Sequence, residues 1–166
     1  HESSDAPPNW GRIAVTYRPI ADLKPNPRNP RRHSRQQVRA LERSIREFGF
    51  IGAVIINRGC MILAGHALWL AAMRAGLKEV PTIEVSHLDE AHELLLMISF
   101  NRLGELSSFE DEALAGLFVE LDGLKLDLDV EVTGFSVAEI DLMIQGGAPP
   151  PENGDVDPAP SPMGPP

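Results

Sequence analysis

Two hydrophobic periods alternate along the first half of the chain. Residues 35–48 place apolar side chains at spacings of three and four, which predicts one buried face of a helix. These side chains are Val38, Leu41, Ile45 and Phe48. Ser34 and Gln37 form a capping box at the start of this helix, and Gly49 ends it. A second helix is predicted from Gly65-His66 to Gly76. Short apolar runs predict strands at 15–20, 53–57, 61–64 and 80–85, with a hairpin turn at 58–59.

The second half has only helical patterns. Asp89 is the predicted cap of a third helix, and capping boxes at Ser108-x-x-Asp111 and Ser136-x-x-Glu139 precede two more apolar-periodic runs. The order of elements predicts an α+β fold, with a small mixed sheet, packed helices and a helical C-terminal half.

Both ends of the chain have compositions that are typical of disorder. Residues 146–166 contain eight prolines and four glycines, and residues 1–11 have few apolar side chains. We therefore expect one domain at 12–145, a disordered N-terminus at 1–11 and a disordered tail or linker at 146–166. Because the tail begins so soon, we also expect that no helix-turn-helix follows the domain and that this chain alone does not read a specific operator.

Charge divides the chain more sharply than its net value of −9 indicates. Residues 1–78 hold 13 Lys or Arg and 5 Asp or Glu, whereas residues 79–166 hold 2 and 19. Cys60 is the only cysteine, which excludes an internal disulfide framework and a Cys-rich zinc site. No apolar stretch approaches the length of a membrane span and no signal peptide is visible, so a cytoplasmic location without a membrane partner is expected.

A stripe of arginines follows the predicted solvent face of the first helix. Its members, called the arginine stripe below, are Arg35, Arg39, Arg43 and Arg46. They lie within roughly 80° of one another at about 100° per residue, and they continue Arg28, Arg31 and Arg32 of a proline-rich loop. Guanidinium groups bind phosphates in pairs of hydrogen bonds, so the stripe and Arg32 are candidate DNA contacts. The alternative is a solvated face that is neutralised by Glu42, Glu47 or the acidic half.

Two further segments contain candidate ligand groups. At 62–66 a strand runs directly into a helix, where free N–H groups attract anions, Gly65 allows close approach, and His66 could donate to a phosphate or shuttle a proton. The alternative is a tight turn with a capping His. Asn101 and Arg102 with Glu105 could close over a nucleotide or a metal, or could simply cap their helix with a local ion pair.

Taken in order, several stretches resemble the N-terminal domain of the ParB family. They are residues 20–31, 44–49, 62–66, 71–72, 76–81, 101–103 and 133–141. The resemblance covers about residues 15–145 and implies the fold shared with sulfiredoxin. It is nearest to the ParB-like nuclease domains of phages and mobile elements, many of which precede a DNA methyltransferase. In partition proteins of the family the site binds CTP, which gates a DNA clamp.

The resemblance implies a set of nucleotide-binding residues in this chain. They are Gly65, His66, Arg28, Arg31, Asn101 and Arg102, with Glu105 as a candidate metal ligand. A nucleoside triphosphate with magnesium, CTP or ATP, is the implied cofactor. However, Leu68 and Phe100 stand where the family usually has an arginine and an acid, so we expect weak binding and slow or no hydrolysis. The sulfiredoxin cysteine is also replaced, by His66.

These observations favour a DNA-binding or nucleotide-binding accessory domain in DNA modification, partition or phage replication. DNA and a DNA methyltransferase domain or partner are the implied macromolecular partners. Two alternatives stay open. One is a nuclease, nucleotide hydrolase or kinase of the same fold, and the other is an interaction module whose site no longer functions. The sequence determines neither the nucleotide nor the oligomeric state.

Overall fold

The computed structural model describes residues 13–146. The disorder expected at 1–11 falls outside these residues, as does the tail from 147 onward. The described order of elements is strand, helix, hairpin, helix, strand and then helices, as the hydrophobic pattern predicts.

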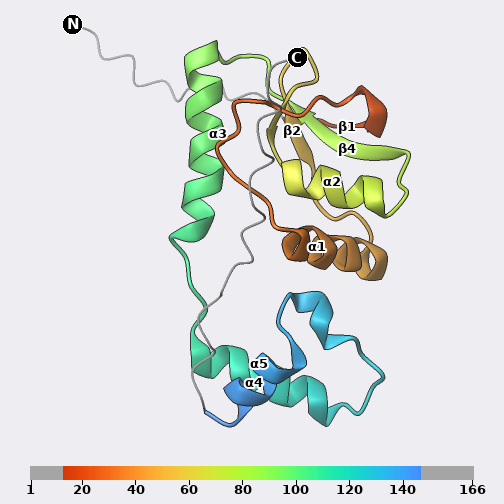
Figure 1. Cartoon of the computed structure of the whole chain (residues 1–166), viewed down its shortest axis with the longest axis vertical. Coiled ribbons are helices and arrows are strands. Elements are labelled where there is room, and N and C mark those ends of the chain that lie inside the picture. Colours follow the sequence, from red (N-terminus) through yellow and green to blue (C-terminus); the bar gives the residue numbers. More distant parts are fainter. Residues whose placement is uncertain (1–12, 147–166) are drawn as a thin grey trace, which may run out of the picture.

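A four-stranded mixed sheet forms the upper part of the molecule (Figure 1). Its strands, in the order β1-β4-β2-β3, are β1 (Val15–Pro19), β4 (Glu79–Glu84), β2 (Val54–Ile56) and β3 (Ile62–Ala64). β4 pairs antiparallel with β1 and parallel with β2, and β2 and β3 form the expected hairpin. The predicted α+β class is thereby confirmed. The chain leaves β1 at Ile20 in a one-turn 3-10 helix, Ile20–Asp22.

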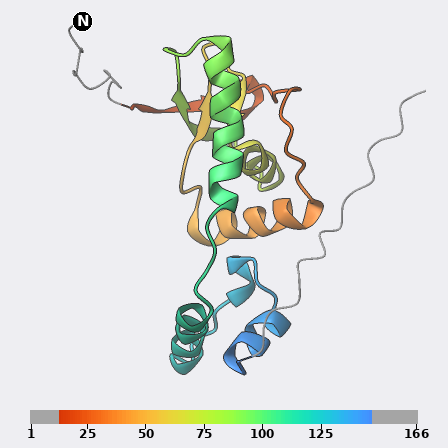
Figure 2. The same ribbon diagram turned by 90° about the vertical axis from the view of Figure 1, so that its left-hand side faces the viewer.

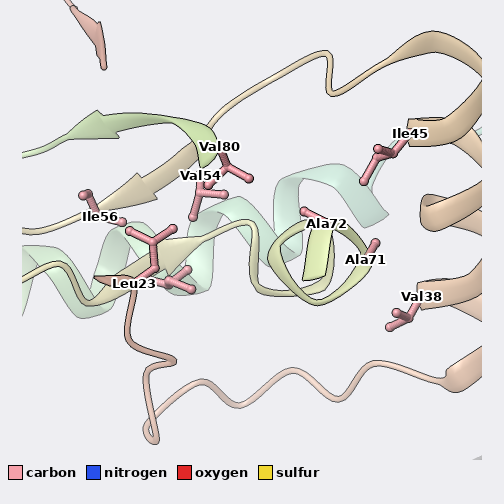
Figure 3. Packing of buried hydrophobic residues seen from close by; sticks show 9 residues of the cluster. Leu23, Val38, Ile45, Val54, Ile56, Ala71, Ala72 and Val80 are labelled. Atoms are coloured by element: carbon pink, nitrogen blue, oxygen red, sulfur yellow. The ribbon is translucent and has the colours of Figure 1, made fainter. Parts of the chain in front are cut away.

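Helices cover the sheet in layers. α2 (His66–Arg74) lies next to the sheet and α1 (Arg35–Phe48) packs on α2, while α3 (Glu90–Glu105) contacts the edge strand β3 (Figure 1). The main core lies between these layers (Figure 3). Ala71 and Ala72 of α2 are fully buried, and their small side chains let Val38 and Ile45 of α1 approach closely.

The remaining helices have a separate core. α4 (Asp111–Gly123), the 3-10 turn η2 (Val130–Thr133) and α5 (Val137–Ile144) lie beyond α1, at the far end of α3 (Figures 1 and 2). Phe118, Ile140 and Met143 are their buried side chains. Phe135 packs edge-on against Phe118 and Phe109, with ring centroids 5.9 and 5.7 Å apart. The described chain therefore has two hydrophobic clusters without a shared member.

Three of the four helix caps predicted at Ser34, Asp89, Ser108 and Ser136 are present in the structure, and Ser108 is the exception. Ser34 Oγ accepts from Gln37 N at 3.0 Å, but the Gln37 side chain bonds the ring of His33 and so does not complete the box. Ser136 and Glu139 form a complete capping box. The box predicted at Ser108 is wrong, because α4 begins at Asp111 with Glu110 as an N-cap that makes no side-chain bond.

One predicted core residue is exposed. Val38 and Ile45 are buried and Leu41 is partly buried, as the helical spacing predicts, but Phe48 is 57% exposed. Phe48 is the last residue of α1, and it is not among the side chains of the main cluster. The helical period indicates which side chains share the buried face of α1. It does not determine how far along α1 the elements that cover this face extend.

Candidate functional site

A polar cavity of about 430 Å³ opens where three segments of the chain meet. Its walls come from the end of the proline-rich loop and the start of α1 (31–41), the start of α2 (65–68) and the end of α3 (100–105). The fold thus brings together segments that lie up to about 70 positions apart, as the bond from Arg31 to Asn101 shows.

Gly65 shapes the floor of this cavity. Its φ of 94° lies in the left-handed region, and a Cβ there would stand 3.4 Å from Val54 Cα. As the N-cap of α2, Gly65 provides no side-chain oxygen to the first turn. The backbone N–H groups at the start of α2, together with the positive end of its dipole, are therefore available to an anion in the cavity.

His66 accepts a hydrogen bond from the proline-rich loop at one of its ring nitrogens. Its Nε2 accepts from the backbone N–H of Asn26 at 3.2 Å, which ties the proline-rich loop to α2. Burial, together with repulsion from His33, lowers the pKa of His66 from 6.5 to about 4. His66 is therefore neutral at pH 7, which argues against a proton shuttle near neutral pH, and its role towards a ligand stays a prediction.

Arg31 links the loop to the end of α3. Its Nη1 donates to the backbone oxygen of Asn101 at 3.1 Å and to Glu105 Oε1 at 2.6 Å. The side chains of Arg31 and Glu105 are 32% and 48% exposed, so water screens the pair in part. Asn101 also donates to Asn29 Oδ1 at 3.5 Å. Five of the residues that the sequence predicts as ligand contacts thus line one cavity. They are Gly65, His66, Arg31, Asn101 and Glu105.

Arg28 and Arg102 do not line the cavity. Arg28 pairs with Glu90 at the other end of α3, at 3.2 Å. Arg102 pairs with Glu105 at 3.3 Å, but its side chain is 64% exposed. Within residues 13–146 no three His, Cys, Asp or Glu side chains group as metal ligands. Glu105, the candidate metal ligand, is instead held by two guanidinium groups.

The cavity wall also contains residues that the sequence did not indicate as site residues, namely His33, Gln37, Leu41, Ala67 and Gly104. His33 Nδ1 lies 3.1 Å from Gln37 Oε1, and its Nε2 is buried without a partner in the described structure. The spacing of four positions between His33 and Gln37 could have indicated that their side chains meet. Leu68 and Phe100, the departures noted in the sequence, also line the cavity and make that part of the wall apolar.

The arginine stripe is exposed on α1, and Arg43 and Arg46 of the stripe form ion pairs. Arg43 contacts Glu131 at 3.3 Å and Asp129 at 3.7 Å, both next to or within η2. Arg46 contacts Glu42 at 3.0 Å, and its hydrogen bond is the main cause of a lowered pKa at that carboxyl. Neutralisation by Glu42 and by the acidic half, the alternative from the sequence, therefore holds for these two arginines.

Arg32 and Arg39 complete the candidate DNA surface. Both are exposed, and neither has an ion pair to another residue of the described range. Arg35 is exposed as well. In residues 13–146 there is also no helix with the length and apolar character required to cross a bilayer.

Two family models match the chain, one after the other. The model described as the ParB N-terminal domain matches residues 9–102, and the model described as the ParB-methyltransferase HTH domain matches residues 112–166. The expectation that no helix-turn-helix follows the first domain is therefore wrong. The early start of the proline-rich tail does not exclude this domain, because the helices from Asp111 onward form a hydrophobic cluster of their own.

Curated relatives agree with the first match. The ParB-like nuclease domain-containing protein YnaK of Escherichia coli (strain K12) is 37% identical over 79 residues, which cover 48% of this chain and 91% of that protein. The chromosome-partitioning protein Spo0J of Thermus thermophilus is 37% identical over 102 residues, which cover 58% of this chain. The match spans only 38% of the Thermus protein's length.

A solved structure shares the fold. C-terminally truncated ParB from Caulobacter crescentus, complexed with CTP-gamma-S, superimposes with a TM-score of 0.63 at 24% identity. The match covers 80% of this chain and 86% of that one.

Proposed function

Because the chain belongs to the family of the ParB N-terminal domain, we propose that it is an accessory domain that binds a nucleotide in its cavity and DNA on its arginine stripe, and that it serves a DNA methyltransferase. The observation that carries the proposal is the cavity at Gly65, where the start of α2 faces Arg31.

The cavity has the groups that a phosphate needs. The first-turn N–H groups of α2 are donors without a side-chain cap, and Arg31 supplies a guanidinium to the same cavity. Leu41, Leu68 and Phe100 offer apolar surface to a base or a sugar. The Caulobacter protein of similar fold was solved with CTP-gamma-S, which supports a nucleoside triphosphate as the ligand class here.

The same geometry argues for weak binding. Arg31 is already paired with Glu105, so a phosphate has to displace that carboxylate or share the guanidinium with it. Leu68 also stands where the family usually has an arginine, and it contributes no positive charge to the cavity. Since hydrogen bonds with a charged partner contribute about 1.5–3 kcal/mol, the loss of one reduces affinity but does not abolish it.

The arginine stripe supports binding to the phosphate backbone of DNA. Contacts of this kind position a protein but carry no sequence information, and they weaken steeply with salt. The match of residues 112–166 to a ParB-methyltransferase HTH domain supports a methyltransferase as the partner. Phage replication and partition are the other settings that the sequence left open.

A nuclease, or a nucleotide hydrolase or kinase of the same fold, is the second candidate, which the name of the E. coli relative favours. Metal-assisted hydrolysis needs grouped carboxylates. Among the described residues that line the cavity, Glu105 is the one carboxylate, and Arg31 holds it. The third candidate is a protein-interaction module that binds no nucleotide. The apolar side chains of Leu68 and Phe100 suit such a module as well as they suit a nucleotide site.

Calorimetric titration with CTP and ATP, with and without magnesium, separates these functions. We expect weak triphosphate binding by the unchanged chain, a clear loss in Arg31→Gln, and no change in Arg58→Gln, a matched control in the β2–β3 turn. Rapid release of phosphate would favour the enzyme. No binding by a folded protein would favour the interaction module.

A further inference from the structure

The helices beyond α3 have a charge that is unusual for a helix-turn-helix match. Residues 111–146, called the acidic helical unit below, contain nine Asp or Glu and one Lys, which is Lys125. Lys125 itself lies 3.6 Å from Asp122. A DNA-binding surface needs cations that replace the counterions of phosphate. The described part of the HTH match is therefore negatively charged, as DNA is.

This unit already contacts the cationic surface of the chain. Arg43 Nη1 lies 3.3 Å from Glu131 Oε2, and Arg43 Nε lies 3.7 Å from Asp129 Oδ2. η2 is also an element that packs on α1 (Figure 1). Asp129 Oδ1 accepts from the backbone N–H of Glu131 at 3.2 Å, which holds the two carboxylates side by side.

The contact between Arg43 and the acidic helical unit is reversible. The side chains of Arg43, Asp129 and Glu131 are 47%, 49% and 40% exposed, so each ion pair is screened by water and salt. The unit has its own hydrophobic cluster, which shares no side chain with the main core. Separation of the unit from α1 therefore does not require that either cluster opens.

We propose that the acidic helical unit is an internal competitor of DNA, which occupies the arginine stripe through Asp129 and Glu131 until phosphate displaces it. The inference rests on the proposed DNA-binding function of the stripe. Arg43 lies between Arg39 and Arg46 on one helix face, and its guanidinium cannot serve a carboxylate pair and a phosphate at full strength together. The remaining acids of the unit extend the repulsion over a Debye length, about 8 Å at physiological salt.

The test compares two double variants that remove the same charge. Asp129→Asn with Glu131→Gln weakens the contact, and Asn keeps an oxygen for the bond to the Glu131 N–H. Glu120→Gln with Asp141→Asn is the control, because both side chains are exposed and neither has an ion pair among the described residues. Binding of a labelled duplex is measured by fluorescence anisotropy at low and physiological salt, and thermal melts verify that all forms are folded.

We expect the first variant to bind the duplex about three- to tenfold more tightly at physiological salt, as the loss of two exposed ion pairs allows, and the control to bind as the unchanged chain does. An equal gain in both variants would show a bulk charge effect and overturn the inference. Unchanged affinity in the first variant, with the unchanged chain binding DNA, would overturn it as well but leave the proposed function standing. If no form binds DNA even at low salt, the proposed DNA-binding function fails and the competition with it.

Discussion

Arg31 Nη1 lies 2.6 Å from Glu105 Oε1, so the guanidinium that lines the cavity is paired with a carboxylate from the end of α3 that lines it too. The two residues lie 74 positions apart, and their contact joins the proline-rich loop to the last turn of α3. An anion that enters the cavity therefore meets a cation whose charge is already compensated.

Removal of this carboxylate should strengthen triphosphate binding. In Glu105→Gln the charge of Arg31 is no longer compensated, and we expect about a tenfold gain, since about 1.4 kcal/mol corresponds to a factor of ten. Calorimetric titration with CTP and ATP measures it, with Glu110→Gln as the control outside the cavity. A loss of affinity that appears only with magnesium would instead make Glu105 a metal ligand.

A new cation at the start of α2 should act in the same direction. Leu68 lines the cavity in the first turn of α2, and Leu68→Arg adds a charged donor there. We expect triphosphate binding to tighten by about an order of magnitude. Leu68→Gln is the neutral comparison, and an equal gain from it would mean that charge is not the missing feature.

Stability should depend on the protonation of His66. Its pKa is about 4 in the fold, against an ordinary value of 6.5, so the unfolded chain binds the extra proton more readily between these pH values. The free energy of unfolding therefore rises with pH from about 4 to 6.5 and is constant above that as far as His66 is concerned. The part due to His66 is on the order of 3 kcal/mol.

Urea unfolding at several pH values, in the unchanged chain and in His66→Gln, isolates this contribution. Gln keeps an oxygen that can accept from Asn26 N–H but does not titrate. The difference between the two should grow between pH 6.5 and 4. Parallel pH profiles would show that burial does not shift the pKa of His66.

Opposite faces of α1 should differ in their effect on stability. Ile45 is 6% exposed in the main core, and Ile45→Ala should cost about 2–5 kcal/mol in the free energy of unfolding. Arg43 has only exposed ion pairs, and Arg43→Ala should cost less than about 1 kcal/mol. Chemical denaturation of both variants tests the helix phase, which equal losses would refute.

The second hydrophobic cluster should unfold without the first. Phe118 is 4% exposed, and Phe118→Ala should destabilise the acidic helical unit by about 3–5 kcal/mol. Amide hydrogen exchange should then accelerate in residues 111–146 and stay slow in β4, α1 and α2. Faster exchange throughout the chain would show a single cooperative unit.

The sequence by itself determined most of the local structure. Hydrophobic spacing assigned the buried face of α1 at Val38 and Ile45, and the caps at Ser34, Asp89 and Ser136 lie where the sequence places them. These features depend on residues within one or two turns, so they can be seen in a single chain. Most of the polar residues that line the cavity were indicated by the resemblance to the ParB N-terminal domain, and not by spacing or caps.

Tertiary structure decided which charges meet. The partners Arg31 and Glu105 lie 74 positions apart and Arg43 and Glu131 88, distances over which no periodic pattern operates. Arg28, close in sequence to Arg31, pairs with Glu90 and does not line the cavity. His66 is neutral because it is buried against the proline-rich loop. The desolvation that lowers its pKa exists only when the chain is folded, since the free energy of a charged group depends on all the atoms packed around it.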